Sequence, residues 1–526
     1  MDSNLKFQKM VDIFINETKV TPDVANAITE LTIVQSFQKP SQCDLQLVLS
    51  KQQYEKQFNN LLEQSRLEIK MGADANPLFF GVITAIVHHY GAAGEFSVQI
   101  TASDHLYLLS LTHPIRSFVD VTLVDIAQQI LSPYGISVNA EEPGPLWNHL
   151  VQYQSSSLEF LQELSERSGM YFYLQDNVLN FVSLAVEEAA VTLDYGSSLL
   201  EIKINNQQLC DATKTVVSGW DPLRTKLFMQ DSLHSSTEDS VFLTAAEPKV
   251  THQTSIVDQP AQSEQQLETL AQAQTLRINA LKNQVSGLAE GNFDLHPGTD
   301  IELKGLLSDD TGQQYRLTQV THTMNPFSGY VSKFNSCPPV LRKRSRSTLT
   351  TFGIVSQIAD PENSGRVKVT LPTYNNIETN WLEVVIPGAG TDKGIIALPA
   401  IDDKVLLIML HERIEQAIVL GGLYGEDGLP EEIIIDGEVS CYSILTPGGQ
   451  GLRLNDQQQS VSLFNQSESS LELNKETAVI STQSGNHITM NDDTMIINSQ
   501  TPLVLQAPGN TITIRASRIN FEKANG

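Results

Sequence analysis

Few side chains in this 526-residue sequence have the spacing that catalysis or metal binding requires. The adjacent Glu431 and Glu432 could form a pair of carboxylates, but neighbours in a short linker cannot flank a glycosidic bond at the separation that hydrolysis needs. His88 and His89 fall in an expected strand, where successive side chains point to opposite faces, so they cannot bind one metal ion together. Neither pair predicts an active site.

The other candidate ligands are isolated from one another. The cysteines are far apart and form no CxxC or Cys/His pattern, so we expect free thiols. They are Cys43, Cys210, Cys337 and Cys441. His487 could bind an ion only if three copies met on an axis, and the tail has no His-x-His pair to strengthen such a site. Because GxSxG, Walker, GxGxxG and HExxH patterns are also missing, we predict no enzyme, no cofactor and no metal site.

The charge balance argues against nucleic acids and membrane surfaces as partners. Lys and Arg total 34 against 61 Asp and Glu, a formal net charge of -27 that repels phosphate groups. Hydrophobic residues make up 40% and charged residues 18%, which is typical of folded soluble domains. No signal peptide opens the sequence and no uncharged apolar run reaches the ~18 residues of a membrane span, so we expect a chain made in the cytoplasm without stable membrane insertion.

Residues 1–340 mix short alternating apolar segments with a few helical stretches, which predicts β-barrels with inserted helices. Capping residues, amphipathic spacing and turn residues locate the clearest elements. These are a helix that begins after Thr122, a helix from Ser156 to Gly169, a hairpin that turns at Asp176-Asn177 and a long helix within 262–284. The region is therefore expected to be mainly β with inserted helices.

Two shorter regions follow. Residues 341–348 contain Arg342, Lys343, Arg344 and Arg346, and on a chain this acidic such a run is more often a solvated linker than a nucleic-acid contact. Residues 349–428 contain several short β-branched runs separated by turns, the pattern of a small closed barrel. Its acids outnumber its basic residues, which argues against a groove for single-stranded nucleic acid.

Residues 437–526 differ in composition, since 36 of these 90 residues are Ser, Thr, Asn or Gln and only three are aromatic. Apolar residues recur there in i, i+2 pairs about every eight residues, which indicates a solenoid or fibrous β-structure. The predicted core residues are Leu452, Leu454, Val461, Leu463, Leu471, Leu473, Ile488, Leu503, Leu505, Ile512 and Ile514. Val479 and Ile496 are expected to fill the gaps in this series.

Two assemblies could bury these side chains. Either one chain coils into a parallel β-helix, or three chains wind around a common axis. The lack of obvious caps disfavours the one-chain form. A one-chain β-helix would suit a tailspike that binds or degrades polysaccharide, but the aromatic residues Tyr442, Phe464 and Phe521 are too scattered to form a sugar-binding groove.

Several segments resemble the VgrG family of type VI secretion spike proteins and related phage hub-spike proteins. The stretch GIVSQIADPENSGRVKVTLP at 353–372 resembles the start of the family's OB-fold, and Trp381 to Val384 and VLGGLY at 419–424 continue the match. The segment 155–174 resembles the helix and hairpin of the family's hub. One departure is Asp402, where many relatives have Gly, and a second is 412–417, which replaces a common Gly-Asp-Pro turn.

The resemblance implies a homotrimer at the tip of a contractile injection system, with a hub, an OB-fold barrel and an intertwined β-helix needle. The hub would adapt a six-fold tail tube to a three-fold spike and contact tube and baseplate proteins, and the needle would puncture the target envelope mechanically. A PAAR-like tip protein would dock at the C-terminal end, and effector cargo could travel with it. The expected docking residues are Arg518, Ile519, Asn520 and Phe521. The particle would be extracellular or cell-anchored.

Overall fold

The computed structural model describes most of the chain. The described ranges are 11–58, 65–70, 77–92, 95–206, 213–221, 226–233, 252–256, 263–307, 312–341, 347–425, 428–429 and 433–523. The basic linker residues, Cys210 and the Glu431-Glu432 pair lie outside these ranges. The chain forms two compact units that divide between Leu423 and Tyr424. Strands dominate both units and helices are inserted in the first, which confirms the mainly β class.

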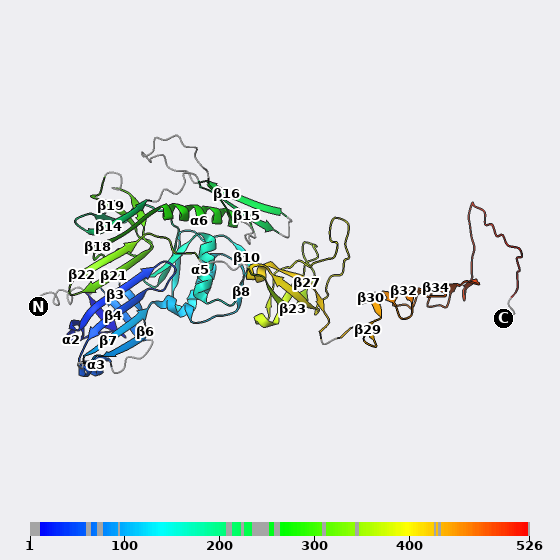
Figure 1. Ribbon diagram of the computed structural model, residues 1–526, viewed down its shortest axis with the longest axis horizontal. Coiled ribbons are helices and arrows are strands. Elements are labelled where there is room, and N and C mark those ends of the chain that lie inside the picture. Colours follow the sequence, from blue (N-terminus) through cyan, green and yellow to red (C-terminus); the bar gives the residue numbers. More distant parts are fainter. Residues whose placement is uncertain are drawn as a thin grey trace, which may run out of the picture. The chain divides into compact units, whose positions relative to one another are not determined.

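The largest sheet of the first unit has eleven strands within the described residues, and every neighbouring pair is antiparallel (Figure 1). From edge to edge the strands are β14 (Leu199–Asn206), β18 (Asn283–Glu290), β22 (Gly329–Asn335), β21 (Gln319–Asn325), β3 (Ile28–Ser36), β4 (Gln42–Val48), β7 (Phe96–Ser103), β6 (Pro77–Tyr90), β5 (Arg66–Lys70), β1 (Asp12–Ile15) and β2 (Thr18–Lys19). The two halves of the sheet bury separate cores, and the ladder between β21 and β3 joins them. The two cores of this region therefore share one continuous sheet, and the two barrels expected from the sequence stay a prediction.

Smaller elements complete each half. Helices α2 (Pro22–Asn26) and α3 (Lys51–Phe58) accompany the first half, and a sheet of β13 (Val191–Asp194), β19 (Asp300–Lys304) and β20 (Gln314–Arg316) accompanies the second. Val24 of α2 and Phe58 of α3 are buried in the first core. Leu193 of β13 and Ile301 of β19 are buried in the second.

A helical insert follows β7. Its elements are η1 (His105–Ser110), β8 (Arg116–Val121), α4 (Leu123–Leu131), η2 (Ser132–Tyr134), β9 (Ser137–Ala140), β10 (Trp147–Gln152), α5 (Ser157–Ser168), β11 (Tyr171–Gln175) and β12 (Val178–Val182). They bury their own core around Trp147, Phe172 and Phe181. The β11–β12 hairpin turns at Asp176 and Asn177, both at positive φ, as their types predicted.

The predicted ends of the inserted helices are confirmed. The Thr122 hydroxyl accepts the N–H of Asp125 at the start of α4, and the Ser156 hydroxyl accepts the N–H of Glu159 at the start of α5. Helix α5 ends at Gly169, whose φ of +69° is the left-handed value that glycine adopts without strain. A side chain at Gly169 would also collide with the helix α6 (Glu264–Lys282).

Helix α6 is the longest helix of the described residues, and it packs across β15 and β16 (Figure 1). These strands belong to a sheet of β16 (Lys226–Leu233), β15 (Thr213–Asp221) and β17 (His252–Ile256). Leu267, Leu270 and Ala271 of the helix meet Val217 and Phe228 of the sheet in a small core. The sequence predicted this helix, whereas the sheet beneath it was not predicted.

The last part of the first unit is a five-stranded antiparallel sheet, consistent with the small barrel expected there. In sheet order the strands are β25 (Ile377–Glu378), β24 (Lys368–Leu371), β23 (Leu349–Gln357), β26 (Lys404–Met409) and β27 (Ala417–Leu423), with single turns η3 (Pro372–Tyr374), η4 (Leu410–Glu412) and η5 (Ile414–Gln416). Val355, Val369 and Leu407 are fully buried in its core. Val151 of β10 packs into the same core, so the hub and this barrel share apolar contacts.

The two departures from the family pattern lie at left-handed backbone positions. Asp402 has a φ of 72° and Glu412 a φ of 56°. Glycine adopts such angles freely, and Asp tolerates them better than most residues because its side chain is short and polar. The turn at Asp402 therefore keeps the geometry that a glycine would have allowed.

The second unit is a chain of consecutive hairpins. A short hairpin of β28 (Ile434–Ile435) and β29 (Glu438–Val439) precedes a seven-stranded antiparallel meander. Its strands are β30 (Cys441–Leu445), β31 (Gly451–Asn455), β32 (Ser460–Phe464), β33 (Ser470–Leu473), β34 (Ala478–Ser481), β35 (His487–Met490) and β36 (Met495–Asn498). Antiparallel pairing contradicts the one-chain parallel β-helix considered for this region, because the coils of such a helix pair in parallel. Across the described residues of both units, no helix is long and apolar enough to span a membrane.

Candidate functional site

Cross-strand pairing in the second unit aligns its apolar side chains on one face. Directly opposed residues of an antiparallel ladder point to the same side of the sheet. Leu463 of β32 opposes Leu452 of β31 and Leu471 of β33, and the same alignment continues through all seven strands. The resulting apolar tail face consists of Tyr442, Ile444, Leu452, Leu454, Val461, Leu463, Leu471, Leu473, Ala478, Ile480, Ile488, Met490, Met495 and Ile497.

The two faces of this sheet differ sharply. On the opposite side, Ser462 is paired with Arg453 and Glu472, and most other positions there are also polar. The apolar tail face remains open to solvent, since Leu463 is 48% exposed and Ile497 is 52% exposed. A continuous apolar surface of this kind on a soluble protein marks an interaction site. Its extent along all seven strands indicates an assembly interface rather than a small-molecule pocket.

Most of the predicted core residues that fall in the meander are placed together. Leu452, Leu454, Val461, Leu463, Leu471, Leu473 and Ile488 all lie on the apolar tail face. The prediction that Val479 and Ile496 fill the gaps in the series of core residues was wrong. Val479 opposes Glu472 on the polar side of the sheet, and Ile496 also points to that side. Ile480 and Ile497 take the apolar positions instead. Turns of unequal length change which residues of the next strand point to the apolar side, because a shift of one residue exchanges the two faces of a strand.

The remaining predicted residues lie beyond the last strand. These are the core residues Leu503, Leu505, Ile512 and Ile514 and the docking residues Arg518, Ile519, Asn520 and Phe521, all exposed. The described residues after Asn498 contain no strand, so the strands expected there do not form within one chain and stay a prediction for the assembly. Pro502 and Pro508 each lack the N–H that a ladder requires, which explains why the meander stops.

The isolated histidines do not assemble into a metal site. His487 opposes Ser481 on the polar side of the sheet, and its Nδ1 lies 3.1 Å from the carbonyl oxygen of Gly485. His88 and His89 are consecutive residues of β6, as expected, and the His88 Nε2 lies 2.6 Å from the Tyr54 hydroxyl. Within the described ranges, no group of three His, Cys, Asp or Glu side chains could hold a metal ion.

The OB barrel has an apolar outer face as well. Phe352 is paired with Leu406, and Ile408 is paired with Ile418, on the side of the sheet that points away from the core. Phe352 is 62% exposed, although it lies in the middle of β23. In a loop of the same barrel, Ile396 is 81% exposed. Like the apolar tail face, this outer OB face lacks a covering element among the described residues.

Hub and OB barrel are joined by polar as well as apolar contacts. The Val151 N–H donates to the Glu415 carboxylate at 2.8 Å, and the Arg413 guanidinium pairs with Glu163 of α5. Tyr153 and Tyr374 pack edge to face with their ring centroids 5.3 Å apart. Side chains from both sides therefore hold the hub and the barrel together.

A tight loop in the family's ADPENSGR segment is organised by Asp360. Its carboxylate accepts hydrogen bonds from the Arg366 Nε at 3.0 Å and the Arg366 Nη2 at 2.6 Å. It also accepts the backbone N–H groups of Glu362 and Ser364. The Arg366 guanidinium and these N–H groups outweigh burial and hold the pKa of Asp360 well below its usual range. One carboxylate therefore closes this loop.

We predict that Asp360→Asn lowers the free energy of unfolding at pH 7 by about 2 kcal/mol, because a charged hydrogen-bond acceptor of Arg366 is lost. The carboxylate with its depressed pKa stabilises the fold above the unfolded-state pKa of about 4, and this contribution is lost as the pH falls further. Calorimetry of the full chain at pH 7 and pH 2.5 should show a larger difference between variant and wild type at pH 7 than at pH 2.5. Glu362→Gln, which removes an exposed partner, is the control with a small expected effect. Equal destabilisation at both pH values would contradict the prediction.

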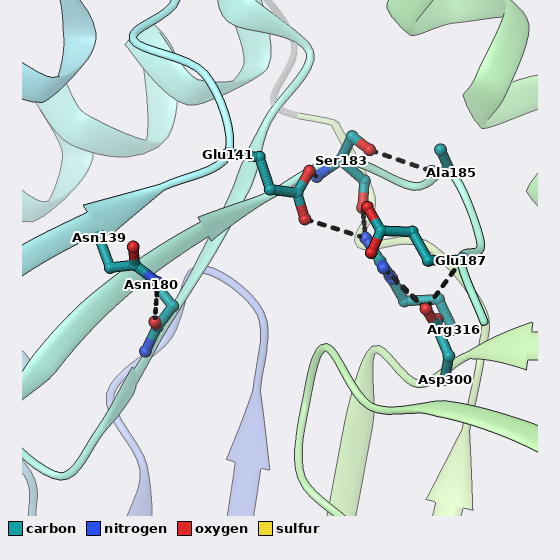
Figure 2. Close-up of polar contacts among 8 residues, drawn as sticks. All are labelled: Asn139, Glu141, Asn180, Ser183, Ala185, Glu187, Asp300 and Arg316. Carbon is teal, nitrogen blue, oxygen red and sulfur yellow. Dashed lines mark hydrogen bonds and ion pairs between the residues drawn. The ribbon is translucent and has the colours of Figure 1, made fainter. Parts of the chain in front are cut away.

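Arg316 organises a buried polar cluster in the hub (Figure 2). Its guanidinium forms two hydrogen bonds to Asp300, at 2.9 and 2.8 Å, and donates to the Ser183 carbonyl at 3.0 Å. Glu141 lies 3.5 Å away, and the N–H of Glu187 donates to the Asp300 carboxylate. Burial opposes the charge on Arg316, but Asp300 outweighs it and raises the pKa of the guanidinium. The cluster ties the helical insert to the small sheet of β13, β19 and β20.

Comparisons with known proteins agree with this architecture. Residues 10–326 match the Alg8 N-terminal domain, and residues 351–424 match the type VI secretion system/phage-baseplate injector OB domain. The type VI secretion system spike protein VgrG1c of Pseudomonas aeruginosa is 21% identical over 408 residues, which cover 70% of this chain and 56% of that protein. The chain thus spans little more than half the length of this curated relative.

Two solved structures share the fold. An E. coli component of the type VI secretion system, described as similar to the T4 bacteriophage tail proteins gp27 and gp5, has a TM-score of 0.53 at 14% identity, over 78% of this chain and 99% of that one. The half-lidded Francisella PdpA-VgrG complex has a TM-score of 0.54 at 10% identity, over 93% of this chain and 88% of that one. Because the Alg8 match covers more than half of the sequence, the chain belongs to the Alg8 N-terminal domain family, and the injector OB domain that follows it makes the chain similar to VgrG-type spike proteins.

Proposed function

We propose that three copies of this chain form the hub and spike at the tip of a contractile injection system. The apolar tail face carries the proposal, because one sheet cannot bury it alone. Three sheets arranged around an axis with these faces inward would enclose a continuous core and place the polar faces outside. The apolar tail face has fourteen side chains. Burying the part of their surface that is still exposed would stabilise the assembly by on the order of 10 kcal/mol per chain. The outer OB face is expected to be buried between copies in the same way.

In this proposal the spike works as a mechanical part rather than an enzyme. The two halves of the hub sheet would offer two similar surfaces per chain, so that three chains present six to a six-fold tail tube and its baseplate proteins. Contraction would push the hub, and the joint around Val151 and Glu415 would pass the load to the OB barrel. A stiff rod of three sheets would then puncture the target envelope. We infer that assembly takes place in the bacterial cytoplasm, before the particle is released or anchored.

The exposed apolar residues after the meander fit a docking role. Ile519 is 48% exposed and Phe521 is 90% exposed, although both are apolar. Three copies would present these side chains together, and a PAAR-like tip protein with an apolar base would cover them. Such a tip, and effector cargo attached to it or to the hub, would complete the spike.

The function can be tested with particles purified from the producing bacterium. A chain that stops after Ser440 retains the hub and the OB barrel but loses the seven-stranded meander. We expect this chain to be recovered in tube-containing particles whose delivery into target cells falls at least 100-fold. Ile519→Ser with Phe521→Ser should keep the rod and lose the tip protein. Normal delivery by particles that contain only the shortened chain would contradict the proposal.

A further inference from the structure

The hub contains a cleft that the spike role does not use. Its volume is about 800 Å³, within the range of ligand sites in proteins. The cleft lies between the β11–β12 hairpin, the segment that leads into β13, and the loop that precedes β19. Arg316 of the cluster in Figure 2 forms part of its lining.

The charged groups of this cleft are nearly all acidic. Carboxylates line it at Asp176, Glu187, Glu188, Asp294 and Asp300. The one guanidinium in the lining, on Arg316, is already held by Asp300. In the described part of the chain, no Lys or Arg forms an ion pair with Glu188 or Asp294. Burial lowers the pKa of the remaining candidate cation, the His296 imidazole, so it is neutral at pH 7.

The walls supply aromatic rings and a spare acceptor. Tyr173 and His296 are stacked, with ring centroids 5.5 Å apart, and Phe293, which also lines the cleft, is 56% exposed. The Gln35 Oε1 is a buried acceptor without a hydrogen-bond partner among the described residues, and its amide nitrogen donates weakly to the Leu78 carbonyl at 3.4 Å. A buried acceptor without a donor costs about 1–3 kcal/mol, so a ligand that donates hydrogen bonds would be stabilised there.

The arrangement of the acids favours an extended cation over an ion. Within the described ranges, the carboxylates do not converge into a group that could hold a metal. The carboxylates come from several segments that line the cleft. An extended chain with several separated positive charges could contact these carboxylates one after another. Arginine is the side chain that combines a donor fork with stacking on aromatic faces.

We propose that this cleft binds an arginine-rich segment of a partner protein. One guanidinium would stack beside Tyr173 or Phe293 and donate to the Gln35 Oε1, while others would meet Glu188 and Asp294 at the rim. The inference is independent of the tail, so it stands or fails separately from the three-copy spike.

A fluorescein-labelled hexa-arginine peptide can serve as the probe, with anisotropy measured on the full chain in 150 mM NaCl. Glu188→Gln with Asp294→Asn should weaken binding at least fivefold. The matched control, Glu55→Gln with Asp392→Asn, changes the net charge equally at exposed positions far apart in sequence, and should weaken binding less than twofold. Phe293→Ser should weaken hexa-arginine more than hexa-lysine, because only the guanidinium gains from stacking.

Three results would overturn the assignment. Binding that is undetectable at this salt concentration would remove the site. Equal weakening by the control pair would show that the peptide senses only the total charge of the chain. If spermine displaced the peptide when both were present at the same concentration of positive charges, the cleft would be a site for small polyamines instead. Unchanged melting temperatures of all variants would establish that folding does not cause the differences.

Discussion

The double substitution Leu463→Asp and Leu471→Asp is expected to convert the proposed three-copy assembly into single chains. The two side chains are cross-strand neighbours at the centre of the apolar tail face. In the assembly each copy would bring two carboxylates into the shared core, and each buried, unpaired charge costs several kcal/mol. Since 1.4 kcal/mol is a factor of ten in an equilibrium constant, association should weaken at least 1,000-fold. Sedimentation velocity at micromolar concentration would show the change in mass.

Ser462→Asp with Thr489→Asp is the matched control. Both positions lie on the polar side of the same sheet, where an added carboxylate stays in water. This variant should keep the mass of the wild type. If both pairs of substitutions dissociated the assembly equally, general repulsion in an acidic protein would explain the result and the apolar interface would be refuted.

Arg316→Leu should destabilise the hub by about 3–5 kcal/mol. The substitution leaves the Asp300 carboxylate, whose side chain is 6% exposed, buried without its cation. It also removes the donor that holds the Ser183 carbonyl. Calorimetry of the full chain should show that the compact unit before Tyr424, which contains the hub, unfolds at a much lower temperature.

Two further variants distinguish the cost of the buried, unpaired Asp300 carboxylate from a general loss of stability caused by substitution. Lys304→Gln breaks a half-exposed ion pair with Glu302 on the same strand as Asp300, and should cost less than about 1 kcal/mol. Adding Asp300→Leu to Arg316→Leu removes the stranded carboxylate and should restore at least half of the lost stability. A double variant less stable than Arg316→Leu would contradict this explanation.

Local signals were enough to predict the helices of the insert. The caps at Thr122 and Ser156 and the stop at Gly169 depend on residues within one or two turns, so the sequence alone contains them. The same holds for the β11–β12 turn. Contacts between distant segments have no such signal: Val151 and Glu415 are 264 residues apart, and nothing near either residue indicates the other. The Arg316 cluster was missed for the same reason.

The tail shows where a periodic pattern reaches its limit. The recurrence of apolar pairs predicted the strands from Leu452 to Ile488, and these strands share one face. Periodicity does not specify how many residues each turn takes, so Val479 was predicted where Ile480 lies. Nor does it show that a strand will find a partner, and beyond Asn498 the pattern continues without a ladder in one chain.

The most direct test of the three-copy spike is the native mass of the full chain. Mass spectrometry under native conditions should give three times the chain mass of 58.0 kDa, and proteolysis of that species should leave residues 441–523 intact. A mass of 58.0 kDa together with an equally resistant tail would show that one copy folds and shields this segment alone, and would contradict the account.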